Sequence, residues 1–127
     1  MDKTQALYVF WASFGIPAID EISAYDEKVM EDLGIDFPYI SFEAAVGEID
    51  SPVALSADLW YRSTSWAGAE AKADQIVRDI GYGGKTVPYT GGMIWITRGT
   101  PAYQRMDAAD HSIRRMHINI NAEFLSA

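Results

Sequence analysis

The stretch that decides the fold is Pro52–Gly81, PVALSADLWYRSTSWAGAEAKADQIVRDIG. In its first half every second residue from Val53 to Tyr61 is apolar, which is the period of a strand with one buried face. Three hydroxyl-bearing residues then interrupt the alternation, and the last of them, Ser65, is placed to cap a helix. Apolar residues recur at helical spacing until Gly81 ends the pattern. The stretch predicts a strand, a turn and a helix, and nothing in it is typical of an active site.

Apolar periodicity predicts a helix and a strand upstream of this stretch. Leucine and aromatic residues spaced i, i+3, i+4 and i+7 place a helix over Lys3–Phe14, which a glycine and a proline end. Residues 16–38 are acidic and lack sustained periodicity, so we expect an irregular loop with room for a short helical turn over 26–33. A strand over Tyr39–Ala45 follows, and a turn joins it to strand 53–62 as a hairpin.

Two further strands are predicted downstream of the long helix. A glycine-rich connection leads to residues 85–88, which we expect to be a short edge segment because Pro88 cannot donate a ladder hydrogen bond. Met93–Arg98 is a strongly apolar strand, and Gly99–His111 is expected to be a loop. The last strand alternates from Met116 to Phe124, with apolar residues on one side and polar residues on the other.

These elements predict an α+β fold in the order α-β-β-α-β-β. We expect residues 1–127 to form a single domain, in which one mainly antiparallel four-stranded sheet has helices packed on one face. The polar side of the last strand then lies on the other face, where it meets solvent or a neighbouring subunit.

Composition and charge exclude several classes of protein. The chain has 127 residues, no cysteine and a formal net charge of −8, and it contains neither a membrane-length apolar run nor the pattern of a signal peptide. Residues 1–60 carry twelve acidic residues and two lysines, whereas residues 61–127 carry six acidic and eight basic residues. A net negative charge disfavours nucleic-acid binding. The asymmetry is either ordinary solubility charge or a sign of two oppositely charged surfaces.

Two short motifs resemble a phosphate-binding loop and a metal site, but neither has the features that such a site requires. Gly84–Thr86 ends like a phosphate-binding loop, but Asp79 stands where that motif needs its first glycine, and the helix precedes the motif instead of following it. Asp107, Asp110 and His111 offer metal-ligating atoms but lie close together in an expected loop, where turn chemistry explains them. We therefore expect no catalytic residue, no cofactor and no metal.

Five side chains are candidates for contacts with other proteins: Trp60, Arg98, Arg105, Arg115 and His117. Trp60 lies on the second face of its strand, which indicates either two-sided packing or an interface anchor. The arginines form a local concentration of positive charge that either faces solvent or contacts acidic residues of a neighbour. His117 lies on the polar face of the last strand, and no serine has a nucleophile-elbow context, so we interpret it as a surface or interface residue.

Several segments together resemble a known family. PVALSADLWYRSTSW (52–66), IWITRGTP (94–101), QRM (104–106) and IRR (113–115) are similar to small tail proteins of long-tailed bacteriophages and prophages, in particular the tail terminator, or tail completion, group. The resemblance is one of pattern and element order over most of the chain, weakest in 16–38, and it includes no catalytic signature.

The resemblance implies a structural protein without enzymatic activity. Members of this group are α/β domains that form a hexameric ring on the tail, stop polymerisation of the tail tube and offer a docking surface to the head. The implied partners are further copies of the chain, the major tail tube protein and the head–tail connector protein, with DNA passing through the ring. The implied location is the virion tail, reached from the host cytoplasm during assembly. Two alternatives stay open: another neck component, and a small ligand-binding or enzymatic α+β domain.

Overall fold

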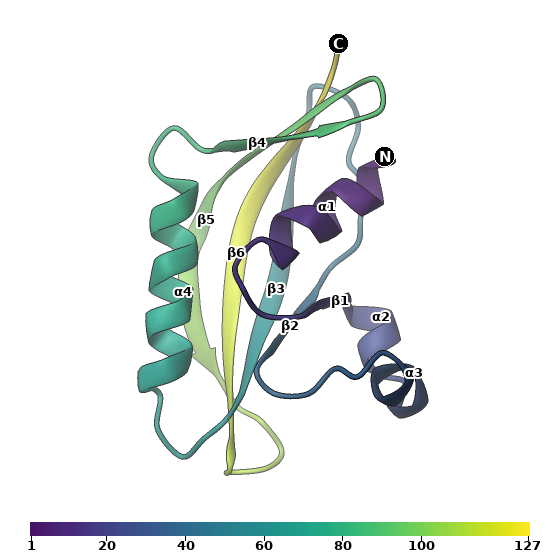
Figure 1. The fold of residues 1–127 in the computed structure, drawn as a ribbon. Helices are drawn as coiled ribbons and strands as arrows, with labels where there is room; N and C mark the ends of the chain where they lie inside the picture. The colour runs from purple at the N-terminus through teal and green to yellow at the C-terminus, as the bar shows by residue number, and fades with distance from the viewer.

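A computed structural model describes all 127 residues and shows a six-stranded mixed sheet partnered by four helices (Figure 1). The strand order is β1-β2-β3-β6-β5-β4. The helices are α1 (Lys3–Ala12), α2 (Glu21–Ala24), α3 (Glu27–Asp32) and α4 (Ala67–Ile80), and the strands are β1 (Ala18–Asp20), β2 (Tyr39–Phe42), β3 (Pro52–Arg62), β4 (Lys85–Tyr89), β5 (Gly92–Met106) and β6 (Ile113–Ser126).

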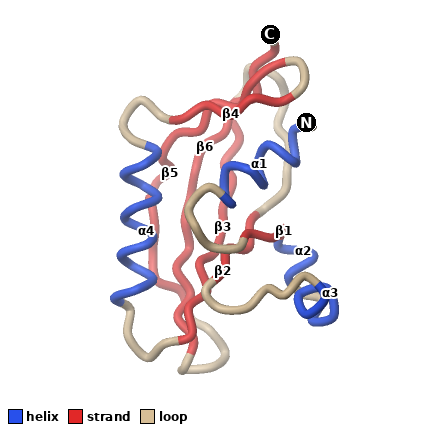
Figure 2. Tube along the Cα trace, in the orientation of Figure 1, coloured by secondary structure: helices blue, strands red, loops and turns tan.

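Three long antiparallel strands, β3, β6 and β5, form the centre of the sheet. Figure 2 shows them running the length of the molecule, whereas β4 turns across one end because the sheet is curled. The two edge strands are short: β1 has three residues and pairs in parallel with β2, and β4 carries Pro88. Short strands and a proline leave little free edge for another strand to join.

One face of the sheet is covered by α1 and α4, and the hydrophobic core lies between these layers (Figure 1). The pairing of β3 with β6 places Leu59 opposite Met116 and Ala57 opposite Ile118, all of them buried. The helices contribute the following buried side chains: Leu7, Phe10 and Trp11 from α1, and Ala69, Ala73, Ile76 and Ile80 from α4.

The expected four-stranded sheet with all helices on one face is wrong. β1 and β4 extend the sheet to six strands, and the parallel β1–β2 pair makes it mixed. The helices are also divided, because α2 lies beside Ser41, Asp58 and Trp60, on the face opposite to α1 and α4. The three residues of β1 are too few to show an alternation in the sequence.

β5 is longer than expected because it continues through the predicted loop at Gly99–His111. The ladder with β6 is regular up to Arg98, shifts register, and resumes at Tyr103. Pro101 falls in this irregularity, which is one of the few places where a central strand accepts a proline. Only residues 107–112 form the connection to β6.

Residues 16–38 contain β1, α2 and α3 rather than an irregular loop with one helical turn, and α3 confirms the turn that was predicted over 26–33. Aspartates start both helices, because Asp20 accepts a hydrogen bond from the backbone N–H of Ser23, and Asp26 accepts from those of Lys28 and Val29. Neither helix buries a residue. They therefore form a corner that is held by capping and by chain connectivity more than by packing.

The predictions of strand 53–62 and of the helix that follows are confirmed to within two residues. Trp66, and not Ser65, occupies the N-cap position of α4, while the hydroxyl of Ser65 accepts a hydrogen bond from Ala67 N–H at 3.2 Å. Gly81 ends the helix with a φ of 69°, a conformation that favours glycine.

The packing of α4 on the sheet yields a stability prediction. We expect Ile76→Ala to lower the free energy of unfolding by about 2–5 kcal/mol, because Ile76 is fully buried and its loss leaves a cavity. Asp79→Ala, on the exposed side of the same helix near its C-terminus, is the control and is expected to be neutral or slightly stabilising. Urea unfolding followed by circular dichroism measures both, and equal effects would contradict the packing described here.

Candidate interaction surfaces

The face of the sheet opposite α1 and α4 is polar, and we call it the open face. The registers of β2, β3 and β6 place Ser41 beside Asp58, Asp58 beside His117, and Trp60 beside both Tyr39 and Arg115. Toward β5 the face continues with these residues: Trp95, Thr97, Gln104, Asn119 and Asn121. Three of the five candidate interface residues, Trp60, Arg115 and His117, therefore lie together on this face.

Asp58 is the centre of the open face. It is 8% exposed and, with Ser41, one of only two buried polar residues in the chain. His117 Nδ1 lies 2.8 Å from Oδ1, and Arg115 Nη2 donates to Oδ2 at 3.2 Å. Arg115 Nε is 3.0 Å from Oδ1, close enough for an ion pair but not aligned for a hydrogen bond. The hydrogen bond to Asp58 raises the pKa of Arg115 above its ordinary value, against the effect of burial.

Trp60 is held beside this ion pair by contacts on several sides. Its indole N–H donates to the hydroxyl of Ser41 at 2.8 Å, its ring stacks on Tyr39 with centroids 6.2 Å apart, and the Arg115 guanidinium lies 5.3 Å from the ring centroid. A cavity of about 210 Å³ opens between these side chains and Tyr25, the residue that follows α2. Trp60 therefore packs against side chains of its own chain on the open face, which is the two-sided packing that the sequence indicated as one alternative.

The other two candidates, Arg98 and Arg105, lie on the opposite side of the sheet, against α4. Arg98 Nε donates to the carbonyl of Val77 at 3.0 Å, and its guanidinium lies over the ring of Tyr82. Arg105 is 3.6 Å from Glu70 and lies over the Trp66 ring. The structure therefore divides the five predicted residues between two separate surfaces.

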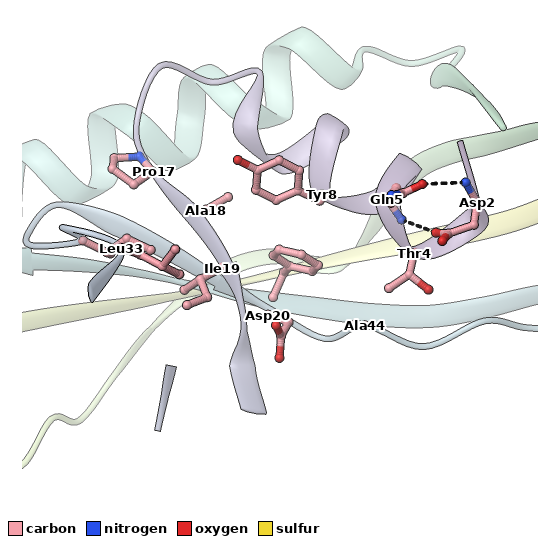
Figure 3. Close-up of a pocket in the computed structure, with 12 residues that line it drawn as sticks. Asp2, Thr4, Gln5, Tyr8, Pro17, Ala18, Ile19, Asp20, Leu33 and Ala44 are labelled. Atoms are coloured by element: carbon pink, nitrogen blue, oxygen red, sulfur yellow. Dashed lines mark hydrogen bonds between the residues drawn. The ribbon is translucent and has the colours of Figure 1, made fainter. Parts of the chain in front are cut away.

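A second feature is an apolar groove between α1 and β1 (Figure 3). It has a volume of about 630 Å³, and we call it the α1–β1 groove. Figure 3 shows Tyr8 on one side of it and Leu33 and Ile19 on the other. Most of its apolar lining comes from these residues: Tyr8, Pro17, Ala18, Ile19, Leu33, Ile35 and Phe42.

Sequence reasoning missed both Asp58 and the groove. Asp58 interrupts no alternation, and its partners lie about sixty positions away, so only the β3–β6 register brings them together. Half of the residues that line the groove fall within 17–35, where the sequence has no sustained periodicity.

The polar side chains at the centre of the open face form an ion pair within the chain and no catalytic arrangement. Asp58 orients His117 through Nδ1, as a carboxylate orients the imidazole of a general base, but no hydrogen bond joins His117 to a serine, threonine or other nucleophile. No group of three or more potential metal-ligating side chains is gathered anywhere in the chain. None of the four helices has the length and apolar character to cross a bilayer.

No protein-family model, no curated protein and no solved structure matches this chain. The likeness to tail terminators therefore depends on the sequence pattern alone.

The Asp58 network yields a second stability prediction. We expect Asp58→Asn to lower the free energy of unfolding by about 1–3 kcal/mol, because it leaves Arg115 and His117 without their anionic partner in a partly buried site. Asp107→Asn, at an exposed loop carboxylate, is the control and should change stability by less than about 0.5 kcal/mol. Urea unfolding at pH 7 compares the two, and an Asp58 variant as stable as the control would show that the network contributes nothing.

The raised pKa values of two tyrosines imply that the protein loses stability at alkaline pH. Burial, followed by the charges of Asp36 and Asp58, raises the pKa of Tyr39 above its ordinary value of 10.0, and burial raises the pKa of Tyr61. Above pH 10 the unfolded chain releases phenolic protons that the folded chain retains, so the free energy of unfolding decreases as the pH rises.

We expect Tyr39→Phe to make this loss of stability between pH 10 and 11 shallower. Tyr25→Phe, at a tyrosine that is 88% exposed, should not change the slope. Thermal unfolding by circular dichroism across this range tests the prediction, and parallel curves for both variants and the parent chain would refute it.

Proposed function

We propose that this chain is a structural protein of a bacteriophage or prophage tail, a tail terminator that forms a ring on the last ring of the tail tube. The support is the resemblance of segments 52–66, 94–101, 104–106 and 113–115 to that group, together with an ordered polar sheet face that no helix of the core layer covers. The ring acts by steric exclusion: it occupies the growing end and presents a new surface to the head.

The open face is the observation that carries the proposal. Its central side chains are already fixed by contacts within the chain, since Asp58 holds Arg115 and His117, and Ser41 holds Trp60. A surface whose side chains are ordered before binding loses less conformational entropy when a partner docks. We assign this face to the contact with the tube.

Charge also suits a ring that conducts DNA without holding it. The net charge of −8 makes the average interaction with phosphates repulsive. Heterologous subunit contacts need two different patches on each copy, and a chain whose acidic residues are concentrated in its first sixty positions offers such a difference.

The direct test combines light scattering after size exclusion with electron microscopy of tail tubes assembled from the tube protein of the same virus. We expect a closed oligomer, or binding confined to tube ends, together with arrest of tube growth. A chain that stays monomeric and ignores tube ends would overturn the proposal. Retention by the head–tail connector protein in a pull-down would then favour a neck component.

A pair of matched variants tests the role of the open face. Gln104→Arg changes an exposed side chain beside His117 that makes no hydrogen bond of its own, and we expect it to weaken binding to tube ends by at least about tenfold. Ala71→Arg adds the same side chain on the exposed side of α4 and should bind like the parent chain. Equal binding by both variants, measured by co-sedimentation with tubes, would remove the open face from the contact.

A further inference from the structure

The α1–β1 groove is an apolar surface with an acidic border. Leu33 is 62% exposed and Tyr8 48% exposed beside it, so a considerable apolar area meets water. Asp2 and Asp20 are the charged residues among its twelve lining residues, and no cation is among them. The adjoining corner, residues 20–36, has seven acidic residues and one lysine. A partner that fills this groove should therefore combine an apolar group with positive charge.

The turn between α4 and β4 has this combination. Tyr82 is 97% exposed, the most exposed large hydrophobic side chain of the chain. The guanidinium of Arg98, which is half-buried, lies 4.6 Å from the centroid of its ring, so a cation lies against the exposed aromatic side chain. Arg78 and Lys85 flank the turn. We call this feature the Tyr82 knob.

The knob and the groove are on different sides of the molecule. In Figure 1 the α4–β4 turn lies at the far left, beyond β5, whereas α1 and β1 lie on the right. One copy therefore cannot fill its own groove with its own knob. A contact between two such patches is heterologous, and it closes into a ring when the rotation from copy to copy allows.

We propose that the Tyr82 knob of one copy inserts into the α1–β1 groove of the next copy. The proposal rests on the ring-forming function proposed above and assigns its lateral contact. Tyrosine suits such a role because its ring fills an apolar pocket while its hydroxyl stays hydrated. Insertion brings Arg98 toward the carboxylates at the groove, Asp2 and Asp20, so that apolar fit and charge act in the same direction.

Two variants block opposite halves of this contact. Tyr82→Ala removes the knob, and Ala44→Trp fills the groove from an exposed lining position; neither removes a buried side chain. We expect each to weaken self-association by about 30-fold, as loss of a central aromatic anchor does. Tyr25→Ala, which removes another strongly exposed tyrosine outside the groove, is the control and should associate like the parent chain. Sedimentation equilibrium at low salt, from micromolar to millimolar protein, measures the self-association of the three variants and the parent chain. Circular dichroism checks that each of them is folded.

Mixing the two blocked variants gives a sharper test. The Ala44→Trp chain retains its knob and the Tyr82→Ala chain retains its groove, so one productive contact remains. We expect the mixture to form a dimer containing one copy of each chain. The dimer cannot grow, because its Tyr82→Ala chain has no knob and the groove of its Ala44→Trp chain is filled. A mixture that stays monomeric, or two variants that associate as the parent chain does, would overturn the inference.

The outcomes separate this inference from the proposed function. If both variants still cap tube ends as rings, the lateral contact lies elsewhere and the terminator function stands. If the mixed dimer forms but the parent chain builds open filaments that ignore tube ends, the contact stands and the terminator function fails. Parent protein that remains monomeric at every concentration and on tube ends overturns both.

Discussion

The register between β3 and β6 is the constraint on which the rest of the structure depends. Eleven residues of β3 pair in sequence with β6, so Leu59 and Met116 point into the core while Asp58 and His117 point to the open face. Because side chains alternate between faces, a slip of one residue would expose the core side chains and bury a row of polar ones. The same alignment thus determines both the packing beneath α1 and α4 and the arrangement of the polar surface.

Burial of Asp58 follows from this register and makes the open face ordered. A residue that is 8% exposed carries a stable carboxylate only with compensating partners, and the neighbouring strand supplies His117 directly opposite and Arg115 at a diagonal position. Arg115 is fixed in turn between Asp58 and the ring of Trp60. A polar surface of this kind has fewer side-chain conformations to lose on binding than a row of free lysines and glutamates, which is why it is the part of the sheet best suited to dock a partner.

The elements that bury many side chains were the ones that could be predicted from the sequence. β3 and α4 were predictable because their apolar residues face one core and therefore recur with the period of the element. α2 and α3 bury no residue, so their sequence has no sustained period, and of the two only α3 was predicted, as a short turn over 26–33. β5 was predicted too short because Pro101 indicates a loop unless the bulge opposite β6 is known. Trp60, Arg115 and His117 could be named as candidates, but their common partner Asp58 required the strand register.

The fold gathers much of the acidic charge of the first half of the chain at one corner of the molecule. Residues 20–36 leave the sheet at β1, form two helices that contribute nothing to the core, and return at β2, so their charges remain on one projecting corner. Three of the later arginines instead make contacts within the chain: Arg98 with a carbonyl of α4, Arg105 with Glu70, and Arg115 with Asp58. The acidic corner is bordered by Arg115 but lies apart from Arg98 and Arg105 on the α4 side, and that polarity favours contacts between unlike faces over contacts between like ones.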